Sequence, residues 1–569
     1  MRTPLRYLVP CVVAVAALAG GDTNLPPEAR SLFDKAEIAR EEGRLEEAAV
    51  LYRQAIGQHA RYFAAHAGLL AAMRGLGTPE AAADLYPGLL AAHSDSPDLQ
   101  AFAASTKPPD QAIIALTGIT QAYGGSARAF VELGRAFLAV GKQREAERVL
   151  KEALTRDSED STARVLLGDC YFRDAKYVNA RKEYETALEK ESDCVAARLR
   201  IPLCLHRSGK TEDALKELRR LVGDDAFPRL VAGHWLIAFL CRETGNRAEA
   251  IKTLDRILDI DKNDHTALIA KGSFLLEDRQ TIEAVKVFQK AVELNPKSGE
   301  ALFCLGWAHE KSADAPEIQD AQRKERLAAA AETYEKCANV DPTVRPRDSF
   351  GFVCLLGDKH ADAMTQFRRA GDIDPKFAPA QNNIGLGSDM ADNRGEAKKR
   401  YEFVLEKIEK ENVRAIVMLA LDYWLDGATP KAIKELERAL KIKPTDDLAW
   451  TFLGDVHYDN KKADNAIKCY RKAVEINSKN FTAWYHMGIA YDDQKRKHEE
   501  ADQCYRKALE ARADPPVELV IRVALVNDDD GLNRLPEALK FYQLYLDLGG
   551  TEDWVPARVD ELNQALAGK

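Results

Sequence analysis

The chain has 569 residues, of which 46% are hydrophobic and 30% charged, with 34 glycines and 23 prolines. One core does not organise so many residues, so the chain is several domains or one modular array, and its apolar share excludes intrinsic disorder. The formal net charge is -9 and the charged residues are interspersed, which argues against nucleic acid as a partner because phosphate binding needs clustered cations.

A short apolar segment opens the chain. Two arginines precede the apolar run of residues 7–18, and Ala-Leu-Ala at 17–19 has the small-x-small pattern of a leader-peptidase site. This order predicts a signal peptide at 1–19, followed by a linker at 20–28. The alternatives are an uncleaved anchor or a mistaken start codon. We expect a periplasmic or secreted protein without a membrane span after cleavage, or a cytoplasmic one if the leader is misread.

Beyond the linker, alanines recur at a spacing of 34 residues within groups. Four residues after each alanine comes a tyrosine or a large apolar residue, and three residues further on a small or apolar residue often follows. The spacing i, i+4, i+7 places all three on one face of a helix. The alanines are Ala48 and Ala82; Ala146, Ala180 and Ala214; Ala250 and Ala284; Ala363 and Ala397; and Ala432 and Ala466.

A first helix is predicted before each alanine-bearing second helix. It carries a large residue, then Leu-Gly or an equivalent, then another large residue, as at Trp450, Leu453, Gly454 and His457. Glycine at the eighth position costs about 1 kcal/mol of helix propensity, so close packing of the two helices must offset it. Further glycines stand between the two helices, where a positive φ ends the first helix within a short turn: Gly43, Gly77, Gly141, Gly209, Gly245 and Gly427.

This combination resembles the tetratricopeptide repeat family over most of the chain, from about Ala29 to Gly549. The resemblance implies an all-α fold, a right-handed α-solenoid (superhelix) of about fourteen helix-turn-helix repeats. The 34-residue period excludes the alternative helical repeats of about 40 to 47 residues.

Interruptions of the repeat divide the chain. Lys107-Pro108-Pro109 breaks one shortened unit, and extra polar residues near 312–327 lengthen a loop or extend two helices. A final helix is expected because the end of a solenoid exposes an apolar face. The predicted segments are N-terminal repeats at 29–126, degenerate at 97–126; a middle array at 127–344; a C-terminal array at 345–549; and a capping helix at 550–569.

Nine cysteines lie beyond the predicted leader. Their odd number and irregular spacing do not form a disulfide framework. Most occupy repeat positions where a small apolar side chain packs between helices, so we expect buried thiols.

Two short strings imitate known sites. Residues 208–211, Ser-Gly-Lys-Thr, lack the first glycine of a phosphate loop, which would stand at Cys204. Residues 527–531 lack the alternating ligands of a calcium loop, and we expect an exposed acidic turn there. No His-Glu-x-x-His, Cys-x-x-Cys or Gly-x-Ser-x-Gly string occurs, so we predict no catalytic residue, metal site or cofactor.

The family resemblance implies that a partner binds on the inner surface of the superhelix, through positions two, five, nine and twelve of the first helices. Acidic groups beside aromatic rings suit a partner segment with Lys or Arg and apolar side chains. In the later repeats these positions include Asn382, Leu386, Asp389, Val417, Leu421, Trp424, Thr451, Asp455, Tyr458, Tyr485 and Asp492.

We therefore expect a protein-protein interaction scaffold or adaptor rather than an enzyme, in an exported bacterial envelope assembly. Repeats fill the chain so completely that no segment of about 100 residues is left for a catalytic domain. The alternative is a regulatory or substrate-presenting subunit of a separately encoded enzyme such as a glycosyltransferase.

Overall fold

The computed structural model describes residues 25–223, 227, 229–314, 318–511, 515–528 and 530–567. Every regular element in these residues is a helix and no strand occurs among them, which confirms the all-α class. The predicted signal peptide lies outside the described residues. No helix in the described part of the chain is long and apolar enough to cross a membrane.

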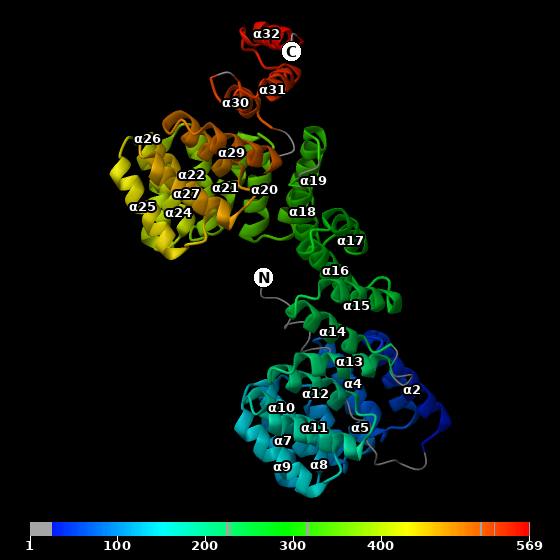
Figure 1. Ribbon diagram of the computed structural model, residues 1–569. Helices are drawn as coiled ribbons and strands as arrows, with labels where there is room; N and C mark the ends of the chain where they lie inside the picture. Colours follow the sequence, from blue (N-terminus) through cyan, green and yellow to red (C-terminus); the bar gives the residue numbers. More distant parts are fainter. Residues whose placement is uncertain are drawn as a thin grey trace. The chain divides into compact units, whose positions relative to one another are not determined.

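The chain forms two compact units, Met1–Gln280 and Thr281–Lys569, here called unit 1 and unit 2. The helices in the described part of unit 1 (Figure 1) are α2 (Pro27–Glu41), α3 (Leu45–Gln58), α4 (Phe63–Gly75), the 3-10 helix η1 (Pro79–Leu85), α5 (Tyr86–Ala92), α6 (Pro97–Ala104), α7 (Pro109–Ala122), α8 (Ala127–Ala139), α9 (Gln143–Arg156), α10 (Ser161–Arg173), α11 (Tyr177–Lys190), α12 (Val195–Arg207), α13 (Thr211–Gly223), α14 (Val231–Glu243), α15 (Arg247–Ile260) and α16 (His265–Glu277).

Unit 2 continues the same pattern of helices. It contains α17 (Thr281–Leu294), α18 (Gly299–Ala313), α19 (Asp320–Val340), α20 (Val344–Leu356), α21 (His360–Ile373), α22 (Ala378–Met390), α23 (Arg394–Phe403), the π-helix η2 (Val404–Ile408), α24 (Val413–Leu425), α25 (Thr429–Ile442), α26 (Asp447–Asp459), α27 (Ala463–Ile476), α28 (Phe481–Ile489), the π-helix η3 (Ala490–Gln494), α29 (His498–Ala511), α30 (Val517–Asn527), α31 (Leu535–Asp547) and α32 (Val555–Ala567).

Within each unit the helices stack as consecutive pairs. The first helices of successive pairs contact one another, as α8, α10 and α12 do in unit 1 and α22, α24, α26 and α28 do in unit 2. Each second helix packs mainly against the first helices on either side of it. The stack therefore bends toward the first helices, which line its inner side. Each unit is thus a solenoid of helix pairs, as predicted.

The predicted alanine stripe forms the core between the paired helices. Every alanine of the stripe is fully buried, and each large residue four positions later is at most 2% exposed. The eighth-position glycines allow this approach, because a Cβ at Gly134 would lie 2.6 Å from Cγ of Leu150. The i, i+4 pattern was therefore a correct guide to burial.

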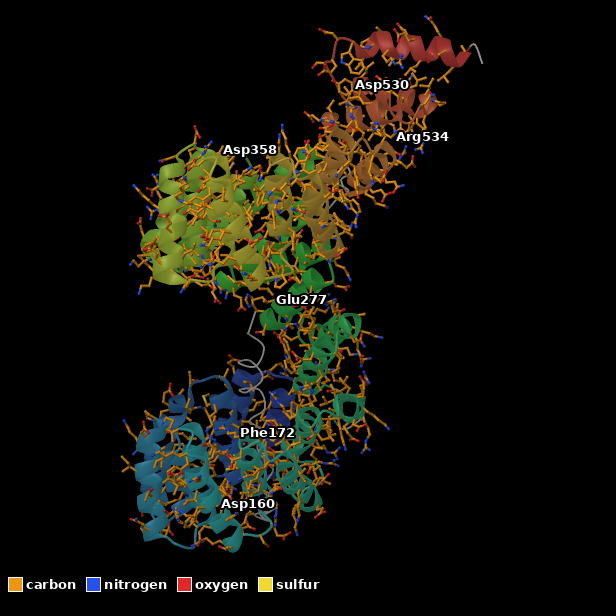
Figure 2. The ribbon with its side chains drawn as sticks, turned by 60° about the vertical axis from the view of Figure 1, so that its left-hand side comes forward. Asp160, Phe172, Glu277, Asp358, Asp530 and Arg534 are labelled. Carbon is orange, nitrogen blue, oxygen red and sulfur yellow. The ribbon has the colours of Figure 1, made fainter. Side chains whose placement is uncertain are left out.

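Most turns between paired helices use a residue with positive φ, although the turn between α6 and α7, at residues 105–108, does not. Gly141 (φ 77°) and Gly209 (φ 80°) confirm the predicted glycine turns, and Gly209 places the string Ser-Gly-Lys-Thr between α12 and α13. Other repeats put a residue with a Cβ at the same position, including Ala175 (φ 57°) and Asp358 (φ 60°), which is labelled in Figure 2. This left-handed conformation costs such residues about 1–2 kcal/mol relative to glycine.

Many first helices begin at a capping side chain. Asp160, labelled in Figure 2 at the start of α10, accepts a hydrogen bond from the Ala163 backbone N–H at 2.8 Å, and Ser126 accepts one from Ala129 at 3.1 Å. Such a cap satisfies a backbone donor that has no partner inside the helix and fixes where the helix starts.

Two π-helices explain where the 34-residue period becomes 35. Ala432 follows Ala397 by 35 residues, and η2 lies between them; Ala501 follows Ala466 by 35 residues, and η3 lies between them. A π-helix absorbs one extra residue without ending the helix. The core alanines therefore stay in register.

Other departures from the regular pattern have visible structural outcomes. The extra residues near 312–327 go mainly into α19, which is 21 residues long.

The second helix around Ala82 is divided into η1 and α5, with prolines near the start of both. The turn after α30 is not the exposed acidic turn that we expected, because Asn527 is fully buried and Asp528 is 8% exposed.

The cysteine prediction is confirmed. The nine described cysteines are free thiols, and all but the half-buried Cys304 are buried.

Unit 1 also contains a contact between distant parts of its sequence. Glu42, in the turn after α2, forms a 2.5 Å ion pair with Arg229, which lies in the segment before α14. The backbone at Gly43 lies against Val231. The curvature of unit 1 thus brings its first helix pair onto its last complete pair.

Candidate partner-binding surface

The predicted partner-binding residues lie on four successive first helices of unit 2 and on η3. Because α22, α24, α26 and α28 contact one another in this order, these residues share one side of the unit, here called the inner surface. α22 carries Asn382, Leu386 and Asp389; α24 carries Val417, Leu421 and Trp424; α26 carries Thr451, Asp455 and Tyr458; α28 carries Tyr485; and η3 carries Asp492.

Four of these side chains are buried between helices. Asn382 is 2% exposed and its amide donates to Asn412 Oδ1 at 3.2 Å. Thr451 is 1% exposed and its hydroxyl donates to the backbone carbonyl of Asp447 at 2.7 Å. Val417 and Asp455 are also buried. Within the folded array these side chains hold the first helices together, and a partner on the inner surface would meet chiefly the other seven.

The accessible part of the inner surface is largely apolar and aromatic. Leu386, Leu421, Trp424, Tyr458 and Tyr485 are all half-buried. Partly buried aromatic rings are rigid anchors, because they bury a large area on binding and lose little side-chain freedom.

Asp455 is engaged inside the array. Its Oδ1 accepts a hydrogen bond from the Tyr470 hydroxyl at 2.7 Å, and His486 Nδ1 of the next first helix donates to the same oxygen, also at 2.7 Å. Burial, with the carboxylate beside it, raises the pKa of Tyr470 far above its ordinary value, so the hydroxyl keeps its proton. This network joins two repeats.

Asp492 lies at the other end of the inner surface, beside basic side chains of the chain itself. His498 Nδ1 donates to Asp492 Oδ1 at 2.9 Å, and Arg522 of α30 lies 3.8 Å from Asp492 and 2.7 Å from Asp493. Tyr458 donates to Asp493 at 3.2 Å. A basic side chain of a partner would therefore compete with Arg522 for these carboxylates.

Asp389 has a different environment. Its Oδ2 accepts a hydrogen bond from the Tyr401 hydroxyl at 2.8 Å, as Asp455 does from Tyr470. The neighbouring group from the next first helix is Asp422, which is 1% exposed and lies within hydrogen-bonding reach of Asp389. Burial raises the pKa of Asp389, and burial together with Asp389 raises the pKa of Asp422 to about 7.

Asp422, His486 and Arg522 were missed by sequence reasoning, which followed only positions two, five, nine and twelve. A signal for the two bases exists, because a base recurs at the sixth position of first helices: Arg200 in α12, His486 in α28 and Arg522 in α30. Asp422 gave no such signal, because its partner stands on a different helix 33 residues away.

Comparison with protein families finds matches to tetratricopeptide repeat models. Models described as "Tetratricopeptide repeat" match residues 131–193, 175–230, 265–298 and 481–515, and a model described as "TPR repeat" matches residues 454–495. The matched segments lie in both units and confirm the resemblance drawn from the repeat pattern.

Several curated proteins are similar to parts of this chain. Anaphase-promoting complex subunit 3 of Schizosaccharomyces pombe is 30% identical over 16% of the chain and 14% of its own length. Superkiller complex protein 3 of Mus musculus is 25% identical over 54% of the chain and 19% of its own length. A probable UDP-N-acetylglucosamine-peptide N-acetylglucosaminyltransferase, SPINDLY, of Hordeum vulgare is 26% identical over 26% of the chain and 15% of its own length. The chain thus spans less than a fifth of each of these relatives.

Two solved structures are similar at low identity. The Cut9-Hcn1 hetero-tetramer of the APC/C matches with 15% identity over 94% of this chain and 98% of that chain, at a TM-score of 0.40. Yeast Tom70 matches with 16% identity over 79% of this chain and 96% of that chain, also at a TM-score of 0.40.

Proposed function

Because this chain is a tetratricopeptide repeat protein, we propose that it is a scaffold that holds a partner protein on the inner surface of unit 2. The observation that supports this most directly is the row of half-buried Leu386, Leu421, Trp424, Tyr458 and Tyr485 on successive helices that contact one another. Such a row offers an extended partner several apolar anchors in a line.

The proposed partner segment carries basic and apolar side chains. The apolar side chains suit the aromatic row, while Asp389 and Asp492 are the carboxylates of the inner surface that are half-buried rather than buried. A Lys or Arg of the partner would be attracted to these ends of the row.

A peptide-selection experiment tests this proposal. The full chain is used to select from a displayed library of random twelve-residue peptides, and the selected peptides are titrated against wild type, Trp424→Ala and Tyr458→Ala. We expect peptides rich in Lys or Arg beside apolar residues, and a loss of about tenfold or more in affinity for each variant. The matched control is Ile476→Ala, which removes an exposed apolar side chain from the second helix α27. Equal losses for Ile476→Ala, or none for the inner-surface variants, would contradict the proposal.

The proposed setting is an exported bacterial envelope assembly, which rests on the composition of residues 1–19. N-terminal sequencing of the native protein tests it. A mature start near Gly20 supports export, whereas a retained Met1 in a cytosolic fraction contradicts it.

A second candidate is a regulatory or substrate-presenting subunit of a separately encoded enzyme. It is favoured by the similarity of 26% of the chain to a relative named as a probable glycosyltransferase. Co-purification from the native organism separates the two candidates, because one enzyme recovered in a fixed ratio favours the subunit and several envelope proteins favour the scaffold.

A further inference from the structure

A carboxylate, a tyrosine and a base form a recurring joint between successive helix pairs. In unit 1, Tyr184 donates to Asp169 at 2.8 Å, and Arg200 of the next first helix binds the two oxygens of Asp169 at 2.6 and 3.1 Å. Asp455 with Tyr470 and His486 repeats this arrangement in unit 2. The base gives the carboxylate, which is largely removed from water, a hydrogen-bonding partner, without which its burial would be costly.

The joint between α22 and α24 lacks this base. Asp389 accepts from Tyr401 like the other carboxylates, but the sixth residue of α24 is Met418, where α12 has Arg200 and α28 has His486. Asp422 lies beside Asp389 instead. Among the described residues, no Lys, Arg or His forms a salt bridge with Asp389 or Asp422, and one carboxylate oxygen of each is buried without a hydrogen bond to a described donor.

The charges around the pair do not replace the missing base. On α23, Lys398 and Arg394 favour the charged form of Asp389, but their ion pairs are formed with Asp426 and Asp392. Lys398 also favours the charged form of Asp422, whereas Asp426 opposes it. The charged groups of the other neighbouring helices interact with other residues. Asp348 of α20 accepts a hydrogen bond from Asn383, and Asp447 of α26 accepts from Asn477 and Asn480. Lys431 and Glu435 of α25 lie near Tyr423, and Arg414 of α24 opposes the rise in the pKa of Tyr401 that burial causes.

Two carboxylates in contact, here the half-buried Asp389 and the buried Asp422, are stable together when they share one proton, because one then donates to the other and only one of them carries a charge. The pKa of Asp422, raised to about 7 by burial and by Asp389, agrees with this geometry. The π-helix η2 lies in the same joint, between α23 and α24. Single-turn π-helices are frequent at functional sites.

We propose that Asp389 and Asp422 form a proton-operated joint between α22 and α24, which is tight when the pair shares a proton and loosens as the pH rises. Because Leu386 stands on α22 and Trp424 on α24, the joint would also set the spacing of the partner's anchors. That last consequence rests on the function proposed above, whereas the joint itself does not.

The direction of the pH effect follows from proton binding. When the joint opens, Asp422 returns to its ordinary pKa of 3.8, so between about pH 4 and pH 7 the closed joint holds a proton that the open joint has lost. The closed state is therefore favoured most at acid pH. Between about pH 4 and pH 7, each pH unit raises the equilibrium constant for opening by up to about tenfold, and above pH 7 this constant changes little.

Hydrogen exchange of the full chain tests the joint without any partner. Exchange is followed by mass spectrometry between pH 5 and pH 8.5, corrected for the intrinsic rate, in peptides from α22, α24, α26 and α28. In wild type we expect protection of α22 and α24 to fall with pH up to about 7 relative to α26 and α28. Asp422→Asn keeps a donor toward Asp389, so we expect protection of α22 and α24 to become independent of pH.

Two further variants keep the result interpretable. Met418→Arg places a base at the sixth position and is expected to flatten the pH dependence even if Asp422→Asn folds poorly. The matched control is Asp455→Asn, which changes a carboxylate that already has a base and is expected to leave the pH dependence of α22 and α24 as in wild type. Parallel pH dependence of all four helices in wild type, or no change in Asp422→Asn and Met418→Arg, would overturn the joint. If no selected peptide depends on Trp424 or Tyr458 for binding, only the proposed partner-binding surface is overturned, and the joint is not affected.

Discussion

At the scale of single residues, the close contact of paired helices depends on the absence of a side chain at the eighth position of the first helix. Gly168 lies against the ring of Tyr184, where an added Cβ would overlap the ring carbons. Since Tyr184 is 1% exposed and hydrogen-bonded to Asp169, the ring has little room to move.

We therefore expect Gly168→Ala to destabilise unit 1 by about 1–3 kcal/mol, because overpacking outweighs the gain in helix propensity. The midpoint of urea unfolding measures this. The control is Gly57→Ala in α3, where nothing lies within 4 Å of the added Cβ, and a gain of up to about 1 kcal/mol is expected. A stabilised Gly168→Ala would contradict the packing account.

The turn residues give the opposite prediction. Ala175 adopts φ 57°, a conformation that glycine adopts without strain. We expect Ala175→Gly to stabilise the folded chain by about 0.5–1 kcal/mol, because the relief of strain exceeds the greater freedom of glycine in the unfolded chain. Gly141→Ala, at φ 77° in an equivalent turn, should destabilise by about 1 kcal/mol or more. Thermal melting of both variants checks whether the signs differ.

Much of this residue-scale pattern was predictable from the sequence. The alanine stripe and the glycine turns depend only on local helix geometry, which repeats along the chain. The contact of Asp389 with Asp422 was not predictable, because it depends on how two first helices cross. The burial of Asp455 was missed for the same reason, since a position on the inner side of a helix is filled by the next helix wherever the two approach closely.

At the scale of elements, the two π-helices show how the array tolerates an extra residue. η2 keeps Val404 fully buried while the residues around Glu406 are exposed. The extra residue is therefore accommodated on the solvent side of the helix.

Deleting Glu406 should convert η2 into regular α-helix and change stability by less than about 1 kcal/mol. Deleting Glu437 from the regular helix α25 should cost several kcal/mol, because it moves Ala439 out of the stripe that packs against the first helix. Circular dichroism and urea unfolding of the two variants make the comparison. Equal losses would show that the π-turn is not a tolerant site.

The sequence located most elements but not their irregularities. The period of 34 residues predicted the helix pairs, and the jump to 35 was visible but had no structural meaning until the π-helices were seen. The sequence near 312–327 was compatible with a longer loop or with extended helices. The residues of Asp320–Val340 favour helix strongly, and they form one long helix.

At the scale of the whole molecule, the buried thiols report on the integrity of both units. Burial raises the pKa of Cys170 in unit 1 and of Cys469 in unit 2 to about 12. In the unfolded chain these thiols return to ordinary values near 9, so thiolate is far more abundant there at pH 8.

We expect the native protein to react with a thiol reagent at pH 8 at least about 100-fold more slowly than the chain in guanidinium chloride. At pH 9 the native reaction should still be far slower than that of the unfolded chain, since almost all of the buried thiols still hold their protons. Absorbance after addition of Ellman's reagent measures both rates. A rapid native reaction of several thiols per chain would contradict the burial of the cysteines.

The division after Gln280 was not predicted. The turn residue Arg279 has φ 62°, like the turn residues of other repeats, so its local sequence does not distinguish this position. A domain boundary depends on the sum of long-range contacts, which no single repeat contains.

The ion pair between Glu42 and Arg229 limits how unit 1 can change during evolution. An open stack can gain or lose a helix pair by duplication or deletion, because each pair depends only on its neighbours. Unit 1 instead joins its first turn to the segment before α14, so one more pair between them would separate Glu42 from Arg229. A change in the number of repeats between them would therefore remove this contact from unit 1, whereas substitutions in the intervening repeats would leave it in place.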